Sequence, residues 1–158
     1  MIEQDELFSI IPHRGRMLLL SRVKEYNLKE KTIEAEYHIT EDCLFYDSAL
    51  AGVPAWAGFE FIAQAISAYS GIRNRENGIP QRMGFILSVS SMRIGIPFFN
   101  AGSAIRIKTR ETERMDLVST FEGELLLGGA KVMEGKLTVM EIDNEQARSM
   151  KEGVYAIK

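Results

Sequence analysis

The sequence contains one cysteine and two histidines, which excludes several classes of protein at once. Cys43 has no partner for an internal disulfide, as is usual in a reducing compartment, where a lone thiol behaves as a small apolar side chain. No pair of cysteines or histidines has the spacing of metal ligands. No glycine-rich phosphate loop and no nucleophile elbow is present either. We therefore expect a site without metal and without a dissociable cofactor.

We expect no secretory leader, and the chain lacks a strong positive charge. Residues 1–15 begin with acidic side chains and contain no long apolar stretch, so they do not resemble a signal peptide. The longest apolar stretch, residues 53–69, is interrupted by Glu60, Gln64 and Ser67, which favours a buried helix over a membrane span. The net charge of -3 gives no reason to expect nucleic acid or an anionic membrane as partner. We expect a cytoplasmic protein.

What is present is enough apolar sequence for one domain with a real core: 158 residues, of which 46% are hydrophobic. No repeat, low-complexity tract or linker divides the chain, so we expect one domain over residues 1–158. Alternation of apolar and polar residues predicts strands at 17–26, 32–39, 83–96, 104–113, 117–127 and 131–142. We expect a short helix at 5–11, stopped by Pro12, and a long one at about 54–70, with Gly71 as its end. The last sixteen residues are polar and predict either a loose tail or a docking segment.

This order of two strands, one helix and four strands predicts an α+β fold. The central helix is apolar nearly all round, so it should be buried on most sides, as it would be if a curved antiparallel sheet wrapped it. A long helix inside such a sheet is the hot-dog fold.

A polar stripe interrupts the apolar helix. Glu60, Gln64 and Ser67 are spaced by four and three residues and therefore share one face. Burying a carboxylate and an amide costs free energy unless partners satisfy them. Two interpretations remain open: an acid or base with an amide beside it, or a structural carboxylate that pairs with turns or with an arginine across a dimer interface.

The two histidines differ in context. His38 lies on the polar side of an alternating strand and should face solvent. His13, in the sequence PHRG, lies in a loop between the first helix and the first strand, where functional residues are common. A cluster of arginines at 73, 75, 82 and 93 is either ordinary surface charge or a contact for an acidic carrier protein.

Three segments together resemble the 3-hydroxyacyl-[acyl-carrier-protein] dehydratases of the hot-dog superfamily. Residues 11–23 (IPHRGRMLLLSRV) resemble the family's N-terminal "LPHR…FLLVDRV" segment, and residues 53–64 (VPAWAGFEFIAQ) resemble the start of its central helix, with Glu60 and Gln64 at the matching places. Residues 92–103 resemble a following strand and turn more weakly. The amino-acid sequence of the helix is most similar to that of dehydratase-like proteins of aryl-polyene and related polyketide clusters.

The resemblance has one departure of chemical importance. The family's main members have a histidine about fourteen residues before the helix carboxylate, in a "GHFPG" loop. In this chain the residue at that distance before Glu60 is Tyr46. Residues 44–52 contain no histidine, and Pro54-Ala55 replaces the usual Pro-Gly.

The resemblance implies a hydro-lyase that removes water from a 3-hydroxyacyl thioester of an acyl carrier protein or coenzyme A. Glu60 would be the acid, Gln64 its partner and His13 the base. Residues expected to bind substrate are Tyr46, Pro54, Ala55, Gly58, Phe59 and Phe85, with a backbone amide at 54–58 for the enolate oxygen. The family also implies a homodimer or a heterodimer with another hot-dog subunit. The alternatives are a non-catalytic acyl-binding subunit, favoured by the missing loop histidine, and an acyl thioesterase.

Overall fold

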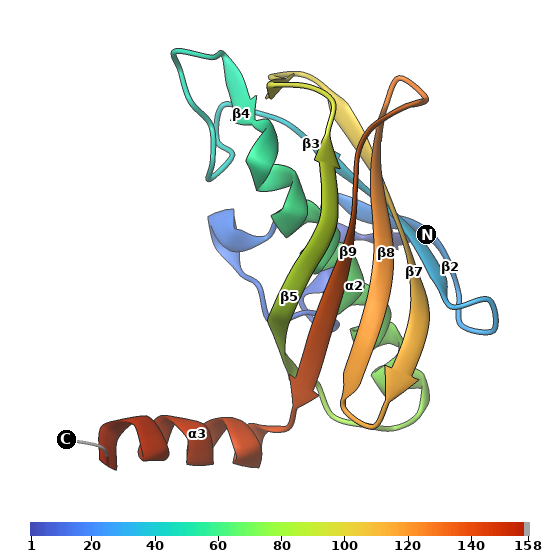
Figure 1. Cartoon of the computed structure of the whole chain (residues 1–158), viewed down its shortest axis with the longest axis vertical. Coiled ribbons are helices and arrows are strands. Elements are labelled where there is room, and N and C mark those ends of the chain that lie inside the picture. Colours follow the sequence, from blue (N-terminus) through green and yellow to red (C-terminus); the bar gives the residue numbers. More distant parts are fainter. Residues whose placement is uncertain (157–158) are drawn as a thin grey trace.

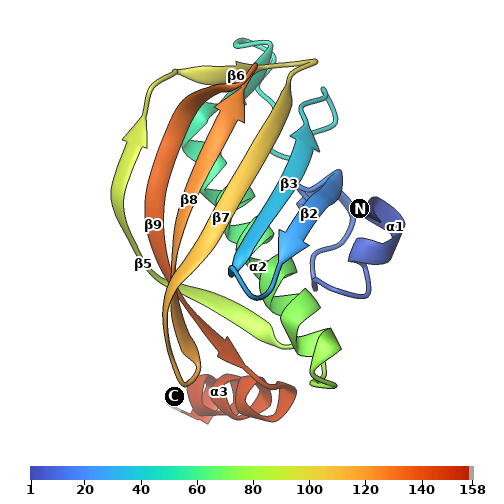
Figure 2. The same ribbon diagram turned by 90° about the vertical axis from the view of Figure 1, so that its right-hand side faces the viewer.

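A long helix, α2 (Gly58–Glu76), lies along the inner face of a curved seven-stranded sheet (Figures 1 and 2). The computed structural model describes residues 1–156, with side chains up to residue 152. All neighbouring strands are antiparallel. The expected α+β hot-dog arrangement is therefore confirmed.

The sheet order is β1-β2-β3-β7-β8-β9-β5, so the first strand after α2 lies at an edge of the sheet, beside the last strand. Its strands are β1 (Ile2–Glu3), β2 (Arg22–Asn27), β3 (Thr32–His38), β5 (Met83–Ile94), β7 (Ala104–Met115), β8 (Val118–Leu127) and β9 (Ala130–Ile142). A separate ladder joins β4 (Gly52–Pro54) to β6 (Phe98–Asn100). The remaining elements are α1 (Gln4–Leu7), the 3-10 turns η1 (Gly15–Met17) and η2 (Ala55–Ala57), and α3 (Asn144–Ala156).

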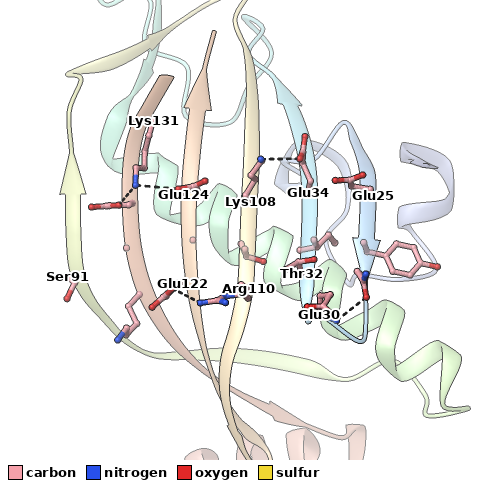
Figure 3. A pocket seen from close by; sticks show the side chains of 18 of the residues that line it. Glu25, Glu30, Thr32, Glu34, Ser91, Lys108, Arg110, Glu122, Glu124 and Lys131 are labelled. Atoms are coloured by element: carbon pink, nitrogen blue, oxygen red, sulfur yellow. Dashed lines mark hydrogen bonds and ion pairs between the residues drawn. The ribbon is translucent and has the colours of Figure 1, made fainter. Parts of the chain in front are cut away.

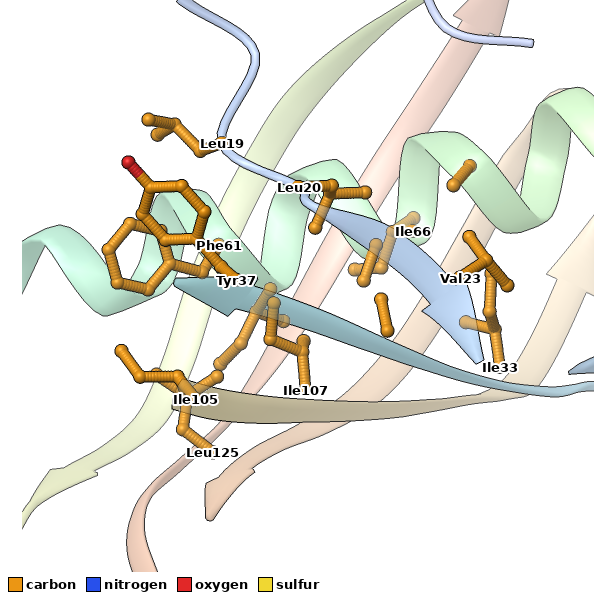
Figure 4. Packing of buried hydrophobic residues seen from close by; sticks show 14 of the residues in the cluster. Leu19, Leu20, Val23, Ile33, Tyr37, Phe61, Ile66, Ile105, Ile107 and Leu125 are labelled. Carbon is orange, nitrogen blue, oxygen red and sulfur yellow. The ribbon is translucent and has the colours of Figure 1, made fainter. Parts of the chain in front are cut away.

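Alternation along the strands decides which face of the sheet meets α2. In β3, Ile33, Ala35 and Tyr37 are buried, while His38 is exposed as expected. The inner side chains pack against α2 residues such as Phe61, and a segment around Leu20 covers the helix from another side (Figure 4). Complete burial of each such apolar side chain contributes about 1.5–3 kcal/mol.

The central helix is longer and begins later than the expected 54–70. Pro54 ends β4, residues 55–57 form η2, and α2 then continues through Gly71 to Glu76. Gly71 does not end the helix: a Cβ there would collide with the backbone oxygen of Ile10, so its missing side chain allows the N-terminal segment to lie against α2. The helix stops before Gly78, whose φ of +66° is the left-handed conformation typical of a helix end.

Two other boundaries differ from expectation. The first helix spans Gln4–Leu7 instead of 5–11, and the first long strand begins at Arg22 instead of residue 17, because the backbone of residues 17–19 bonds to α2 and not to a strand. The last sixteen residues were expected to form either a loose tail or a docking segment. Residues 144–156 form α3, and residues 157–158 lie outside the described part of the chain. Within residues 1–156, no helix is long and apolar enough to span a membrane.

Candidate active site

A groove of about 390 Å³ runs between α2, the N-terminal segment and β5. Its wall includes His13 and Glu60 at one end, Ser67 and Phe85 along its length, and Asn74 at the other end. The structure thus brings the two candidate catalytic side chains from distant parts of the sequence into one groove.

His13 and Glu60 face each other. The distance from His13 Nε2 to Glu60 Oε1 is 4.0 Å, and 24% of each side chain is exposed. Burial lowers the pKa of His13 below its ordinary value of 6.5; the nearby Glu60 charge opposes this shift and Arg14 adds to it. The ring is therefore mainly neutral at neutral pH and able to accept a proton. Among the described residues, its buried Nδ1 has no hydrogen-bond partner.

Arg14 holds the loop that carries His13. Its guanidinium donates hydrogen bonds to the backbone oxygens of Phe8 (2.7 Å), Ile11 (2.7 Å) and His13 (2.8 Å). The same group stacks over the Phe8 ring at 5.2 Å. Because a guanidinium has several donors in a rigid plane, one side chain can fix three carbonyls of an irregular loop.

Gln64 connects the N-terminal segment to α2 and to the carboxylate. Its Oε1 accepts a hydrogen bond from the backbone N–H of Leu19 at 2.7 Å, and its Nε2 donates to the backbone oxygen of Met17 at 2.7 Å. The same Nε2 lies 3.3 Å from Glu60 Oε1. The buried amide of the polar stripe is thus satisfied by backbone groups, and it also fixes the orientation of Glu60.

The groove follows one face of α2 from Glu60 through Ala63 and Ser67 to Ser70 and Asn74. At 1.5 Å per residue, this stripe spans about 21 Å. From the sequence, Glu60 and Ser67 were placed on one helix face, Ser70 was not singled out, and Asn74 was excluded because the helix was expected to end at Gly71. The spacing of three and four residues reaches Ser70 within the expected helix, and continued past Gly71 it reaches Asn74.

A buried ionic network closes the far end of the groove. Arg73 donates hydrogen bonds to Glu111 and Glu141, both at 2.8 Å, and Asn74 Nδ2 donates to Glu141 at 3.2 Å. Arg73 is therefore occupied within the fold, and Arg93 lies apart on the exposed end of β5, near Glu134. The arginines noted in the sequence do not form one patch.

Five of the six residues expected to bind substrate lie outside this groove; only Phe85 is part of its wall. The backbone N–H of Ala55 bonds to the oxygen of Pro97 at 3.0 Å, and that of Gly58 bonds within η2, so neither amide is free for an enolate oxygen. Gly58 instead faces the sheet, where a Cβ would collide with Met133. The other three residues outside the groove are Tyr46, Pro54 and Phe59.

The start of β5, residues 83–86, lines the groove, and β5 is an edge strand of the sheet. One edge of this strand pairs with β9, and no described strand covers the other. Large apolar side chains are nevertheless exposed along it: Met83, Phe85, Ile86, Leu87, Val89 and Ile94. A long apolar edge strand of this kind is a surface on which another strand can pair.

A larger hollow, of about 900 Å³, lies on the outer face of the sheet and does not include His13 or Glu60 (Figure 3). Its side chains are charged and mostly paired with one another. Glu34 contacts Arg106 at 2.7 Å and Lys108 at 3.6 Å, and Lys131 contacts Glu134 at 2.8 Å. This balance of charge is typical of a solvated sheet face.

Comparison with known proteins agrees with the resemblance. The chain is 28% identical over 152 residues to the 3-hydroxyacyl-[acyl-carrier-protein] dehydratase FabZ of Myxococcus xanthus, covering 91% of this chain and 95% of the relative. It is 23% identical over 147 residues to FabZ of Chlamydia trachomatis, covering 89% and 92%. It is also 27% identical over 140 residues to the bifunctional enzyme LpxC/FabZ of Chlorobaculum tepidum; this match covers 86% of the chain but only 29% of that relative.

Solved structures support the same fold. A chain of the dehydratase heterocomplex ApeI:P from Xenorhabdus doucetiae superposes with a TM-score of 0.83 at 22% identity, covering 91% of this chain and 95% of that chain. A putative thioesterase from Ralstonia eutropha has a TM-score of 0.58 at 19% identity, covering 75% and 82%. The family model described as ApeP-like, ApeP dehydratase, matches residues 6–151. The chain therefore belongs to the ApeP-like dehydratase family of hot-dog proteins.

Proposed function

We propose that this protein removes water from a 3-hydroxyacyl thioester, with His13 as base and Glu60 as acid. The observation that carries the proposal is the His13–Glu60 pair, 4.0 Å apart at one end of the groove beside α2. The FabZ relatives, which are dehydratases of acyl carrier protein thioesters, favour a carrier-bound substrate over coenzyme A.

In this mechanism the thioester lies in the groove with C2 near the His13 ring. The reacting form has a neutral His13 ring and a protonated Glu60 carboxyl: Nε2 of the ring accepts the proton from C2, Glu60 donates its proton to the hydroxyl on C3, and water leaves to give the trans-2-enoyl thioester. The proton on His13 then returns to Glu60 across the 4.0 Å gap. The lowered pKa of His13 supports the role of base, because it keeps the ring unprotonated at neutral pH.

In this proposal His13 takes the place of the histidine that is missing from residues 44–52. The family's loop histidine is absent from residues 44–52, and Tyr46 lies outside the groove. His13 reaches Glu60 from the N-terminal segment, through a loop held by Arg14 and by Gln64. One chain thus supplies both a base and an acid, while the open edge of β5 leaves one side of the groove for a second hot-dog subunit to complete.

A second candidate function is that of a non-catalytic acyl-binding subunit paired with an active dehydratase. Two observations favour it. The chain lacks the family's loop histidine, and the structure with a TM-score of 0.83 comes from a heterocomplex of dehydratase subunits. In this case the groove holds the acyl chain, and the reacting residues come from the partner.

The test is mass-spectrometric turnover of a 3-hydroxyacyl carrier protein by the purified protein. We expect the substrate to lose the mass of one water molecule. Glu60→Gln should abolish this loss, and His13→Ala should slow it by about 100-fold or more, the usual contribution of a positioned base. Matched controls are Glu124→Gln and His38→Ala, which make the same changes on the outer face of the sheet and at an exposed strand end.

Each outcome selects one function. Dehydration that depends on Glu60 and His13 but not on the control residues supports the proposal. Release of free acid would identify a thioesterase. An unchanged substrate that still binds to the protein would contradict catalysis by this chain alone and favour the non-catalytic subunit.

A further inference from the structure

The far end of the groove gives a carrier-bound substrate no way out. Arg73 closes it by pairing with the nearly buried carboxylates of Glu111 and Glu141, both at 2.8 Å. A carrier protein has to stay in solvent, so the arm that joins it to the thioester leaves past the end with His13 and Glu60. The acyl group then lies inside the groove along α2.

An exposed tryptophan stands at the end where the arm leaves. Trp56 lies in η2, four residues before Glu60, and η2 runs directly into α2, so the two residues are about one helical turn apart. The side chain is 55% exposed, although burial of so large an apolar group would stabilise the fold. Its place next to the reacting carboxylate makes it a surface that a bound substrate can cover.

The ring of Trp56 is held in place. Phe45 contacts it edge to face, with ring centroids 5.5 Å apart and ring planes at 71°. The segment that carries Phe45 is fixed by Arg16, whose guanidinium donates hydrogen bonds to the backbone oxygens of Asp42 at 3.2 Å and Cys43 at 3.4 Å. A ring that is already ordered loses little conformational entropy when a ligand covers it.

The same N-terminal segment connects this ring to the reacting pair. Met17, the residue after Arg16, accepts a hydrogen bond at its backbone oxygen from Gln64 Nε2, which lies 3.3 Å from Glu60 Oε1. Contacts therefore run without interruption from the exposed indole to the reacting carboxylate. A ligand that leaves Glu60 on this side meets a surface of fixed shape.

We propose that Trp56 is a binding platform for the pantetheine arm of the carrier thioester. This inference rests on the proposed function, because it takes the thioester to lie between His13 and Glu60. Trp56 stands about 6 Å before Glu60 along the helix axis, and long side chains of a helix lean toward its N-terminus. The indole therefore meets the arm beyond the amide nearest the sulfur, where the apolar dimethyl group of the pantoyl unit packs on the ring.

The test compares two thioesters of the same 3-hydroxyacyl group, one on pantetheine and one on N-acetylcysteamine, which ends just after that amide. Trp56→Ala should lower kcat/KM at least about fivefold for the pantetheine thioester and less than about twofold for the N-acetylcysteamine thioester. Trp56→Phe, which keeps a flat apolar ring, should restore most of the loss. Met115→Ala, at an 82% exposed site on the end of β7, is the control and should change neither value.

A second readout follows from the tryptophan itself, which is the protein's one tryptophan. In Glu60→Gln, which binds substrate without turning it over, the pantetheine thioester should shift the emission to the blue and the N-acetylcysteamine thioester should not. Equal losses for both thioesters in Trp56→Ala, or an unshifted emission while the unchanged protein still turns over, would overturn the platform and leave the proposed chemistry intact. A shifted emission without any turnover by the unchanged protein would support the platform and contradict the proposed chemistry.

Discussion

Replacement of Gln64 by leucine keeps the approximate size of the side chain but removes both of its hydrogen-bonding groups. The backbone N–H of Leu19, a residue that is 1% exposed, then loses its partner, and so does the less buried oxygen of Met17. A buried polar group without a partner costs about 1–3 kcal/mol, and the Met17 oxygen can regain part of its bond from water. We therefore expect a loss of about 2–3 kcal/mol in the free energy of unfolding.

The assay is urea unfolding at one fixed protein concentration, because association adds to apparent stability. With a denaturant slope of about 2 kcal/mol per molar urea, the midpoint should fall by about 1–1.5 M. Ser67→Ala, one turn further along α2, is the control and should change stability by less than about 0.5 kcal/mol. If Gln64→Leu shifts stability no more than this control does, Gln64 does not hold the N-terminal segment on α2.

Two further predictions concern ionisable groups. Because burial lowers the pKa of His13 below 6.5, the unfolded chain takes up a proton at higher pH than the folded chain does, so stability should fall as the pH drops below about 6.5 and level off below the folded pKa. Urea midpoints measured between about pH 7 and 5 should lose this part of their slope in His13→Gln and keep it in His38→Gln. Arg73→Ala leaves two nearly buried carboxylates without their cation and should cost about 3–5 kcal/mol by the same assay, whereas Arg110→Ala, in an exposed ion pair, should cost less than about 0.5 kcal/mol. Similar losses for the two arginine variants would contradict the buried network.

The sequence by itself determined the elements whose pattern is local. Alternation in β3 predicted which side chains face the core, and the apolar run around Phe61 predicted a buried central helix. Both patterns depend only on the periods of a strand and a helix, so they can be recognised without knowledge of the neighbours. The order of the elements then predicted the α+β hot-dog arrangement, and the motifs around His13 and Glu60 predicted the family.

Only the tertiary structure decided which distant residues meet. The glycine at position 71 has the same sequence pattern whether it ends a helix or admits a neighbouring chain, and the contact with Ile10 distinguishes the two. That contact and the bonds of Gln64 bring His13 to Glu60. A backbone amide at 54–58 was expected to be free at the start of the helix, but the amides of Ala55 and Gly58 bond to carbonyl groups that the folded chain places beside them. Local periodicity predicts an element, whereas a site depends on contacts between elements, which the sequence does not encode at any fixed spacing.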